Sequence, residues 1–566
     1  MPQSGYASDM ALLDTIRESV IGNNETVNGP FGERPVVYAD YTASGRSLAF
    51  IEDYIRDVVL PLYANTHTES SGTGLQTTRF REDARRLVGQ CFGARAEHAV
   101  LFCGSGSTGA IAKLVGVLGL KIPSELEDQY HVSQAIPADE RPVVFIGPYE
   151  HHSNELVWRE SIADVVTIQE DADGHVDLAH LEHELDRHKD RPRLFGSFSA
   201  ASNVTGIVTD TAAVSGLLHR YGAKAFWDYA AAAPYVSIDM ADATQTDGYL
   251  DAVFVSPHKL IGGPGTPGLL VARRDLFTNR VPDTPGGGTV KYVNYLEHDY
   301  LDDVEHREEG GTPDIVGSVR CGLVFQLKEA VGVDEITSRE HAFVTAAIDR
   351  WSQHENLQVL GSREADRLSI VSFVVKDPDG GTGFYLHHNF VVAVLNDLFG
   401  IQSRGGCSCA GPYGHRLLGI DLDRSHEFER EITRGCEGIK PGWVRVNFNY
   451  FIDDMTFDYI TTAVELIADH GHALLAQYRF EPDSGLWTHR NGRGAPPLSL
   501  MDIDYSRGAM QYEAHRPGFE TADLRAYLDT ARAILTVAAH SAAGADHPET
   551  NADFELLRWF RYPDEA

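Results

Sequence analysis

Between about residue 35 and residue 275 the chain alternates short apolar runs with stretches of helical pattern, and this alternation constrains the fold more than any other feature. Strands that alternate with helices favour a mostly parallel sheet covered on both faces. We therefore predict an α/β fold with a large, mostly parallel seven-strand sheet. The predicted strands are 36–40, 99–103, 143–147, 165–168, 194–199, 223–228 and 252–256, and the predicted helices are 109–120, 154–162, 176–188 and 211–221.

The pattern changes after the glycine-rich stretch 286–288, and a chain of 566 residues is long enough for several domains. Helices at 316–331, 339–352 and 387–399 with strands at 370–375 and 443–448 predict a smaller α/β domain. Past residue 480 the chain becomes polar and irregular and regains a helical pattern at 521–540. We expect four parts: an N-terminal segment 1–34 that packs with the small domain, a large domain 35–315, a small domain 316–480 and a C-terminal extension 481–566.

The charge balance argues against a nucleic-acid partner. The net charge is −34, from 82 acidic and 48 basic residues, and such a surface repels phosphate backbones. No secretory leader is recognisable, and no apolar run is long enough to cross a bilayer. We expect a cytoplasmic protein without a membrane partner.

The cysteines and histidines give little sign of a metal site. Six cysteines are too few for a disulfide scaffold at this length, and Cys407 with Cys409 is a C-x-C without a second pair. His180, His183 and His188 have near-helical spacing among charged residues, which is typical of a solvated helix face. We expect no metal.

A small-residue turn follows the predicted strand 99–103 and opens a helix at 104–109. Glycines let a backbone approach a phosphate, helix N-terminal amides point at it, and the hydroxyls of Ser107 and Thr108 add donors. The same turn could also be a simple helix cap. In an open parallel sheet, ligands bind beyond the carboxyl ends of the strands, so residues at other strand ends belong to the same neighbourhood.

A second strand end carries Ser256, His258 and Lys259, followed by a glycine-rich turn at 262–265. A desolvated lysine here has a lowered pKa and becomes a usable amine, while Ser256 and His258 can donate to a phosphate. The alternative is a surface lysine whose stem covers apolar neighbours.

Two further strand ends complete the pattern. Asp228 ends the strand 223–228, where a carboxylate can keep a pyridine nitrogen protonated, although Asp is also a common helix N-cap. His151 lies in the segment 150–154 that follows the strand 143–147, where an imidazole can stack on a planar ring.

The order of these strand ends resembles the class V branch of fold-type I pyridoxal-phosphate enzymes. Four further segments share this resemblance: SAASNVTG (199–206), REEGGTP (307–313), SRGGCSCAGP (403–412) and KPGWVRVNFNYF (440–451). Over about residues 35–475 it is most similar to cysteine desulfurases, selenocysteine lyases and the desulfurase domain of molybdenum-cofactor sulfurases. The cofactor implied is pyridoxal 5'-phosphate.

The resemblance implies a role for each matching position. Lys259 matches the Schiff-base lysine, Asp228 the partner of the pyridinium nitrogen, and His151 the stacking histidine. Asn203 matches a residue near the cofactor ring. Residues that match the phosphate-binding set are Ser107, Thr108, Ser256 and His258.

Other matches concern the substrate and a second subunit. Arg445 matches the arginine that binds the substrate carboxylate, and Arg404 lies in the segment that carries the nucleophile. Thr312 matches a residue that reaches the neighbouring subunit's phosphate, which implies a homodimer. Register places Cys409, rather than Cys407, on the nucleophilic cysteine of the desulfurases. The two cysteines could instead be a small pair that lines a loop.

The resemblance implies a cysteine desulfurase that forms a persulfide on Cys409, releases alanine and passes sulfur to an acceptor protein. One position departs from the pattern, because Ala231 stands where desulfurases carry a glutamine that hydrogen-bonds the cofactor's phenolic oxygen. A C–S lyase or an epimerase of the same family needs Lys259 and Asp228 but not Cys409. A regulator or scaffold built on a retired enzyme fold is a third hypothesis, and the intact Lys259 and Asp228 argue against it.

Overall fold

The computed structural model describes residues 5–66, 68–241, 247–378, 383–492, 498–512, 523–540 and 547–565. The chain divides into two compact units. The first comprises Met1–Ile21, Tyr41–His341 and Gly361–Leu368, and the second comprises Gly22–Asp40, Ala342–Leu360 and Ser369–Ala566. The four-part division at residues 34, 315 and 480 stays a prediction.

The first unit is built on a seven-stranded sheet in the order β4-β10-β9-β8-β7-β5-β6. Only β10 runs antiparallel to its neighbours, so the other six strands share one direction. This confirms the predicted mostly parallel sheet of seven strands. The strands are β4 (His98–Cys103), β5 (Val143–Ile146), β6 (Asp164–Thr167), β7 (Leu194–Ser199), β8 (Lys224–Asp228), β9 (Ala252–Val255) and β10 (Gly268–Arg273).

The membership of the sheet differs from the prediction at one strand. Of the predicted run 36–40, only β3 (Val37–Tyr38) is a strand; it belongs to the second unit, where it pairs with β16 (Ile401–Gln402). The seventh strand is β10, which pairs with β4 and β9. A short apolar run predicts a strand but does not say which sheet it joins, because the pairing is decided by tertiary contacts.

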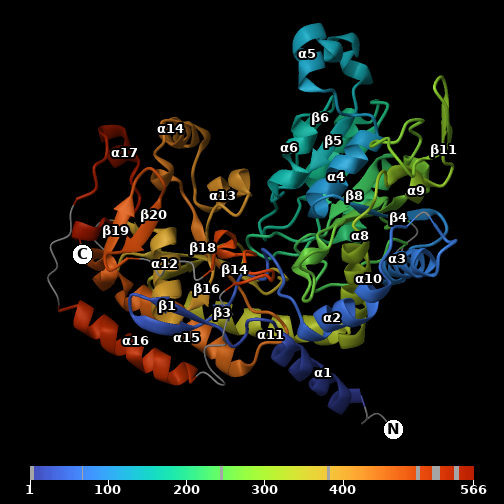
Figure 1. Ribbon diagram of the computed structural model, residues 1–566. Coiled ribbons are helices and arrows are strands. Elements are labelled where there is room, and N and C mark those ends of the chain that lie inside the picture. The colour runs from blue at the N-terminus through green and yellow to red at the C-terminus, as the bar shows by residue number, and fades with distance from the viewer. Residues whose placement is uncertain are drawn as a thin grey trace. The chain divides into compact units, whose positions relative to one another are not determined.

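Helices flank the sheet of the first unit (Figure 1). α4 packs on β4, β9 and β10, and α8 packs on β7 and β8. Aspartates start several helices, as Asp210 does for α8 by accepting the N–H of Ala213 at 2.9 Å. The helices are α1 (Gly5–Ser19), α2 (Ala49–Tyr54), α3 (Gly72–Cys91), α4 (Gly106–Val117), α5 (Ser124–Tyr130), α6 (Leu156–Arg159), α7 (Leu178–His188), α8 (Thr211–Arg220), α9 (Val304–Glu308) and α10 (Ile315–Val331).

A two-stranded hairpin, β11 (Val290–Val293) with β12 (His298–Tyr300), projects from the first unit (Figure 1). Its tip is apolar and open to solvent, since Tyr295 is 94% exposed and Leu296 is 80% exposed.

The second unit has its own five-stranded antiparallel sheet in the order β13-β14-β18-β17, with β15 also paired to β14. The boundary between the units falls within α11 (Val333–Ser352). The strands are β13 (Leu357–Val359), β14 (Ile370–Lys376), β15 (Tyr385–Leu386), β17 (Arg404–Gly406) and β18 (Trp443–Asn447). The remaining elements before the extension are β1 (Thr26–Gly29), β2 (Gly32–Pro35), α12 (His388–Phe399), α13 (Gly411–Leu417), α14 (Leu422–Thr433) and α15 (Asp454–His470).

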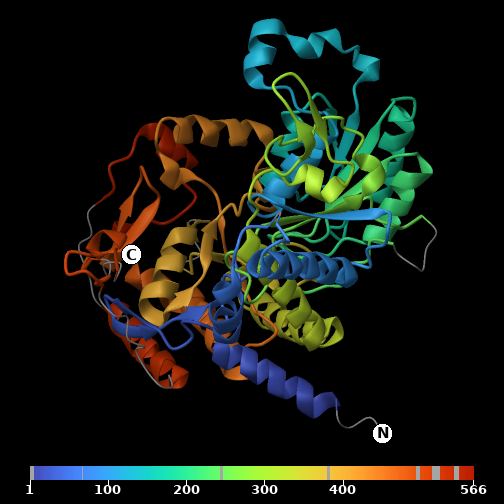
Figure 2. The same ribbon diagram turned by 45° about the vertical axis from the view of Figure 1, so that its right-hand side comes forward.

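The C-terminal extension folds as part of the second unit. It contributes β20 (Leu486–His489), whose hairpin partner β19 (Tyr478–Glu481) begins just before it, and then α16 (Leu524–Ala538) and α17 (Ala552–Leu557). The predicted helical pattern at 521–540 is confirmed by α16, which packs on α15 and α12 through Leu528 and Leu535. Figure 2 shows the red C-terminal elements around the orange hairpin. None of the helices in the described ranges combines the length and the apolar character that a bilayer crossing needs.

Candidate active site

The strand ends predicted from the sequence meet at one edge of the seven-stranded sheet. β10 is antiparallel to both β4 and β9, so β4 runs in the same direction as β9, β8, β7 and β5. Their carboxyl ends therefore lie on the same side. The segments that follow them are 104–109, 147–154, 200–209, 228–231 and 256–259.

The N-terminus of α4 packs closely against the segment after β9. The N–H of Ser107 donates to Oγ of Ser256 at 2.8 Å, and a Cβ on Gly106 would lie 2.7 Å from that oxygen. Gly106 also has a φ of +57°, and a Cβ on Gly268 would collide with its carbonyl oxygen. Glycine is therefore required here, and the backbone amides of the first turn of α4 lie beside two serine hydroxyls.

Asp228 is buried at the end of β8, with 4% of its surface exposed. Its Oδ1 accepts the N–H of Ala230 at 2.9 Å. Burial raises the pKa of the Asp228 carboxyl, while this hydrogen bond, the charge of Lys259 and the Ser107 hydroxyl lower it. Lys259 and Ser107 thus both lie within electrostatic or hydrogen-bonding range of Asp228, as the sequence predicts for residues at neighbouring strand ends.

His151 follows β5 and is linked to α4 through Ser153. Nδ1 of His151 accepts the N–H of Ser153 at 3.1 Å, and Oγ of Ser153 lies 2.7 Å from Oγ1 of Thr108. An accepting Nδ1 assigns the ring proton of a neutral imidazole to Nε2. The structure therefore joins two predicted residues, His151 and Thr108, by way of a serine that the sequence analysis did not single out.

Glu150 is a second buried carboxyl that the sequence analysis passed over. It accepts the N–H of Ser199 at 2.8 Å, the Ser199 hydroxyl at 2.6 Å and Nδ2 of Asn154 at 2.6 Å. Burial, with a smaller contribution from the charge of Asp228, raises the pKa of Glu150 to about 7 despite these three donors. An acidic residue shortly after the predicted strand 143–147 was the available signal.

Lys259 and His258 lie in the short turn Pro257–Lys259 directly after β9. Burial lowers the pKa of His258 to about 4, and the Lys259 charge adds to this shift, so the imidazole is neutral at physiological pH. Nδ1 of His258 lies 3.3 Å from Oγ of Ser44, and the His258 carbonyl accepts the N–H of Gly45.

Two other predicted residues, Asn203 and Thr312, lie in connecting segments. Asn203 is buried in the connection between the paired residues Ala201 and Val208, after β7. Thr312 is exposed beyond α9, and its Oγ1 accepts a long hydrogen bond of 3.4 Å from Nδ2 of Asn65.

In the second unit, Arg445 and Arg404 face one carboxylate. They are register partners on β18 and β17. The Arg445 guanidinium donates to Oδ1 of Asp40 at 3.0 Å, and Nε of Arg404 donates to Oδ2 at 3.1 Å. Burial lowers the pKa of Arg445, and the nearby Asp40 and Cys409 oppose that shift. Asp40 was missed as a site residue, although it ends a predicted apolar strand, the position that marked Asp228.

Cys409 lies on a strained turn directly after β17. Ser408 has a φ of 51° and Cys409 has a φ of 57°; they are two of the three non-glycine residues with positive φ in the described part of the chain. Cys409 is exposed, whereas Cys407 is half-buried. Left-handed backbone at non-glycine residues costs energy and is concentrated at functional sites. The turn presents Cys409, rather than Cys407, to the solvent.

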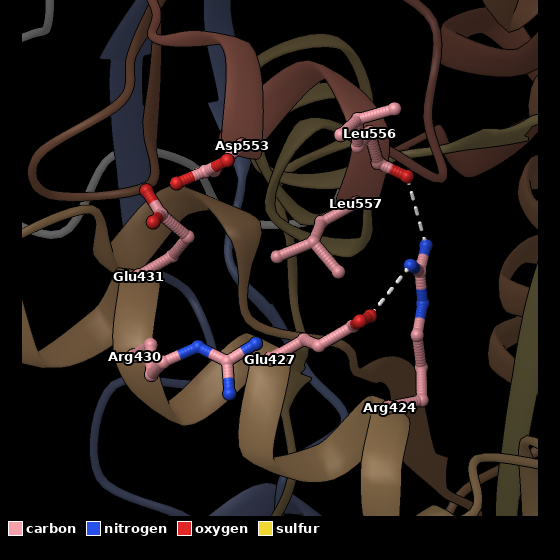
Figure 3. A pocket seen from close by; sticks show the side chains of 7 residues that line it. All are labelled: Arg424, Glu427, Arg430, Glu431, Asp553, Leu556 and Leu557. Atoms are coloured by element: carbon pink, nitrogen blue, oxygen red, sulfur yellow. Dashed lines mark hydrogen bonds and ion pairs between the residues drawn. The ribbon is translucent and has the colours of Figure 1, made fainter.

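Neither of two surface cavities is lined by a predicted site residue. One of about 350 Å³ lies between α14 and α17, where Arg424 bonds both Glu427 and the Leu556 carbonyl (Figure 3). Another of about 290 Å³ is lined by Thr66, Arg81 and neighbouring residues of the first unit. Within the described ranges, no group of three or more His, Cys, Asp or Glu residues is arranged to hold a metal ion.

The first unit fits pyridoxal 5'-phosphate. The cradle at Gly106 would be filled by a single Cβ, and it offers backbone amides and serine hydroxyls to a phosphate. The buried Asp228 is suited to a ring nitrogen and Lys259 to the carbonyl carbon. A phosphate cradle, a buried carboxylate and a lysine at one edge of a mostly parallel seven-stranded sheet define a pyridoxal-phosphate enzyme of fold type I.

Comparisons with known proteins agree with this class. The family described as aminotransferase class-V matches residues 37–421. A probable cysteine desulfurase of Halalkalibacterium halodurans is 26% identical over 393 residues, which are 69% of this chain and 86% of that protein. A cysteine desulfurase of Dickeya dadantii is 27% identical over 413 residues, which are 72% of this chain and 90% of that protein.

Among solved structures, the apo cysteine desulfurase from Thermococcus onnurineus superposes with a TM-score of 0.62 at 22% identity, over 81% of this chain and 98% of that one. The chain belongs to the aminotransferase class-V family, whose members use pyridoxal 5'-phosphate.

Proposed function

We propose that the protein is a cysteine desulfurase that transfers the sulfur of L-cysteine to Cys409 and releases alanine. The observation that carries the proposal is the left-handed turn that exposes Cys409 directly after β17 and within range of the buried Arg445 charge. The desulfurase names of the relatives from Halalkalibacterium halodurans and Dickeya dadantii support it.

The cofactor-binding roles follow the strand ends of the first unit. Lys259 would hold pyridoxal phosphate covalently as a Schiff base, Asp228 would face the ring nitrogen, and His151 would stack on the ring. Asn203 would lie near the ring. The phosphate would take hydrogen bonds from Ser107, Thr108, Ser256 and His258. When bound, the cofactor supplies an electron sink for a negative charge that develops at the substrate's Cα.

The chain's own residues then divide the remaining work. Arg445 and Arg404 bind the substrate carboxylate, and Nζ of Lys259 accepts the proton from the substrate's Cα and can return it. The thiolate of Cys409 attacks the substrate's sulfur, so that an S–S bond forms while the substrate's Cβ–S bond breaks. The balance is L-cysteine plus the Cys409 thiol giving alanine plus a Cys409 persulfide. The proposal requires Lys259 and Cys409 to reach the same substrate molecule.

A paired assay of the purified protein and its Cys409→Ala variant tests this function. Alanine and sulfide are measured after addition of cysteine and a reductant, and cofactor absorbance is recorded for both proteins. We expect alanine only from protein with an intact Cys409, with equal cofactor absorbance in both. The Cys407→Ala variant is the matched control and keeps its activity.

Other outcomes separate the alternatives. Sulfide release that survives Cys409→Ala would contradict the persulfide mechanism and indicate a C–S lyase. Protein that binds the cofactor but is inert toward cysteine would favour an epimerase or a lyase with another substrate. Purified protein that does not bind the cofactor would favour a regulator or scaffold. The buried Ala231, which has no polar side-chain atom, is the feature that makes these alternatives worth testing.

A homodimer is part of the proposal. Thr312 is exposed. A residue that contacts the phosphate of a neighbouring subunit must be exposed when the chain is alone. The apolar tip of the β11–β12 hairpin, with Tyr295 and Leu296 open to solvent, offers surface that association would cover.

A sulfur-acceptor protein and a cytoplasmic location complete the proposal. The exposed Cys409 can pass its sulfur to an acceptor thiol. All six cysteines are free thiols, as is usual in a reducing compartment.

A further inference from the structure

The segment 559–562 of the C-terminal extension bridges to the second unit's sheet. Phe560 forms a parallel bridge with Tyr385 of β15. The N–H of Tyr385 donates to the Trp559 carbonyl at 3.1 Å, and the N–H of Arg561 donates to the Tyr385 carbonyl at 3.2 Å. These bonds fix the C-terminal segment 559–562 beside the start of α12.

Trp559 stacks on His387 at that helix start and contacts the tilted ring of His388. Its ring lies 5.2 Å from the His387 ring at 22° and 5.8 Å from the His388 ring at 37°. Its Nε1 donates to the Ile439 carbonyl at 2.9 Å. His387 accepts the N–H of Asn389 on Nδ1, and its Nε2 lies 3.1 Å from the Gly438 carbonyl, which makes it a neutral imidazole.

His388 packs near β17, the strand that precedes Cys409. A Cβ on Gly442 would lie 2.8 Å from both Cδ2 and Nε2 of His388 and 2.8 Å from Cα of Gly406. The backbone of Gly442 therefore packs closely against both the imidazole and Gly406, the last residue of β17. Burial lowers the pKa of His388 to about 3, so the ring packs as a neutral group.

Asn389 makes a second link from the extension to β17. Its Nδ2 donates to the Gly485 carbonyl, in the turn of the β19–β20 hairpin, at 2.8 Å. A Cβ on Gly405 would lie 2.9 Å from its Oδ1. Two parts of the extension thus reach two consecutive residues of the strand that leads into the cysteine turn.

We propose that the C-terminal extension positions the Cys407–Cys409 turn, and that Trp559 is a positioning residue that acts through His387 and His388. The inference rests on the proposed role of Cys409 in sulfur transfer. Ser408 and Cys409 are held in the left-handed region, which surrounding structure must enforce because isolated residues leave it. The packing of Trp559 on His387 and His388 supports Gly406, the end of β17, and the Cys407–Cys409 turn starts from that residue.

The test compares Trp559→Ala, Trp559→Phe and Leu556→Ala. Leu556 is 76% exposed on the neighbouring α17, so its variant controls for a general disturbance of the extension. One readout is the rate at which iodoacetamide alkylates Cys409, measured on the holoenzyme by peptide mass mapping, which needs no turnover. The second is the separation of kcat from KM for cysteine, and the third is the thermal unfolding midpoint.

In Trp559→Ala we expect kcat to fall roughly tenfold, with KM and cofactor absorbance within about twofold of the wild type, because a displaced reacting group loses rate before binding. Alkylation of Cys409 slows by a similar factor, because the displaced turn no longer holds the thiol exposed to the reagent. Trp559→Phe keeps a ring on the histidines and restores both rates, and Leu556→Ala matches the wild type.

The proposal is overturned if Trp559→Ala alkylates and turns over at wild-type rates, or if Leu556→Ala shows the same losses. It is also overturned if kcat falls only in step with the unfolding midpoint and Trp559→Phe gives no rescue. Failure of the proposed desulfurase function can be told apart from failure of this proposal. Sulfide release that persists in Cys409→Ala would contradict the desulfurase function, while the alkylation rates would still show whether Trp559 positions the cysteine turn.

Discussion

The buried guanidinium of Arg445 donates to Oδ1 of Asp40 at 3.0 Å, and this contact fixes the orientation of the arginine within the second unit. The other carboxylate oxygen is occupied by Nε of Arg404 at 3.1 Å. One carboxylate therefore orients both arginines proposed to bind the substrate carboxylate, and it compensates a charge that burial disfavours.

Replacement of Asp40 by Asn should weaken both substrate binding and folding. Loss of a charge-assisted hydrogen bond to the buried Arg445 costs about 2 kcal/mol of unfolding free energy. The freed guanidinium also loses its fixed orientation, so KM for cysteine should rise more than kcat falls. Urea denaturation and steady-state kinetics check the two effects.

Arg404→Ala is the matched comparison for Asp40→Asn. Arg404 is half exposed, so its ion pair contributes at most about 1 kcal/mol to stability. If the two variants lost the same stability, the buried Arg445–Asp40 contact would not be the dominant one.

Gly106→Ala should weaken cofactor binding while the fold remains. The new Cβ would lie 2.7 Å from Oγ of Ser256, in a backbone conformation with φ of +57°. The first turn of α4 must then move away from the Ser256 hydroxyl, and we expect at least a roughly tenfold loss of pyridoxal-phosphate affinity, equivalent to one lost hydrogen bond to a charged group. Cofactor titration by absorbance measures it. Gly72→Ala, at a position with open space around it, should bind the cofactor normally.

The shared location of the strand ends was predictable from the sequence because it follows from topology alone. Asp228 ends β8, and Ser256 and Lys259 follow the end of the parallel neighbour β9, so their proximity needs only the strand directions. The sheet membership of β3 and β10, by contrast, depends on long-range pairing. Asp40 and Glu150 were missed because a carboxylate acquires its importance from the partners around it, and those partners are far away in the sequence.

The positioning contacts of the extension could not be predicted either. Nothing in the residues around Trp559 indicates that its ring stacks on His387, more than 170 positions earlier, because aromatic packing has no sequence period across such a separation. The helix α16 was predictable, since its apolar face repeats with the helical period.

The exposed hairpin tip leads to a prediction about assembly. If the β11–β12 hairpin contacts a second subunit, Tyr295→Asp combined with Leu296→Asp places two charges in an apolar contact and should shift the protein from dimer to monomer. Sedimentation equilibrium reports the mass directly. Leu500→Asp combined with Met501→Asp adds the same charge at exposed positions of the extension and should leave the dimer intact. A wild-type protein that sediments as a monomer would contradict the homodimer itself.

Glu150 should give the protein a characteristic pH dependence of stability. Its pKa is raised from about 4.5 in the unfolded chain to about 7 in the folded protein, mainly by burial, so between these values the folded state binds more protons. Stability must then fall as the pH rises from about 4.5 to 7 and level off above that, at a total cost of about 3 kcal/mol. Glu150→Gln removes this titration. The new side-chain amide also faces the Nδ2 donor of Asn154, which lowers the unfolding free energy by an amount that does not depend on pH. The unfolding free energy of the wild type relative to the variant, measured by urea denaturation, should therefore decline across that window. A difference that stays constant from pH 5 to pH 8 would mean that Glu150 is already ionised at pH 5, held in that state by the two hydrogen bonds from Ser199 and the one from Asn154.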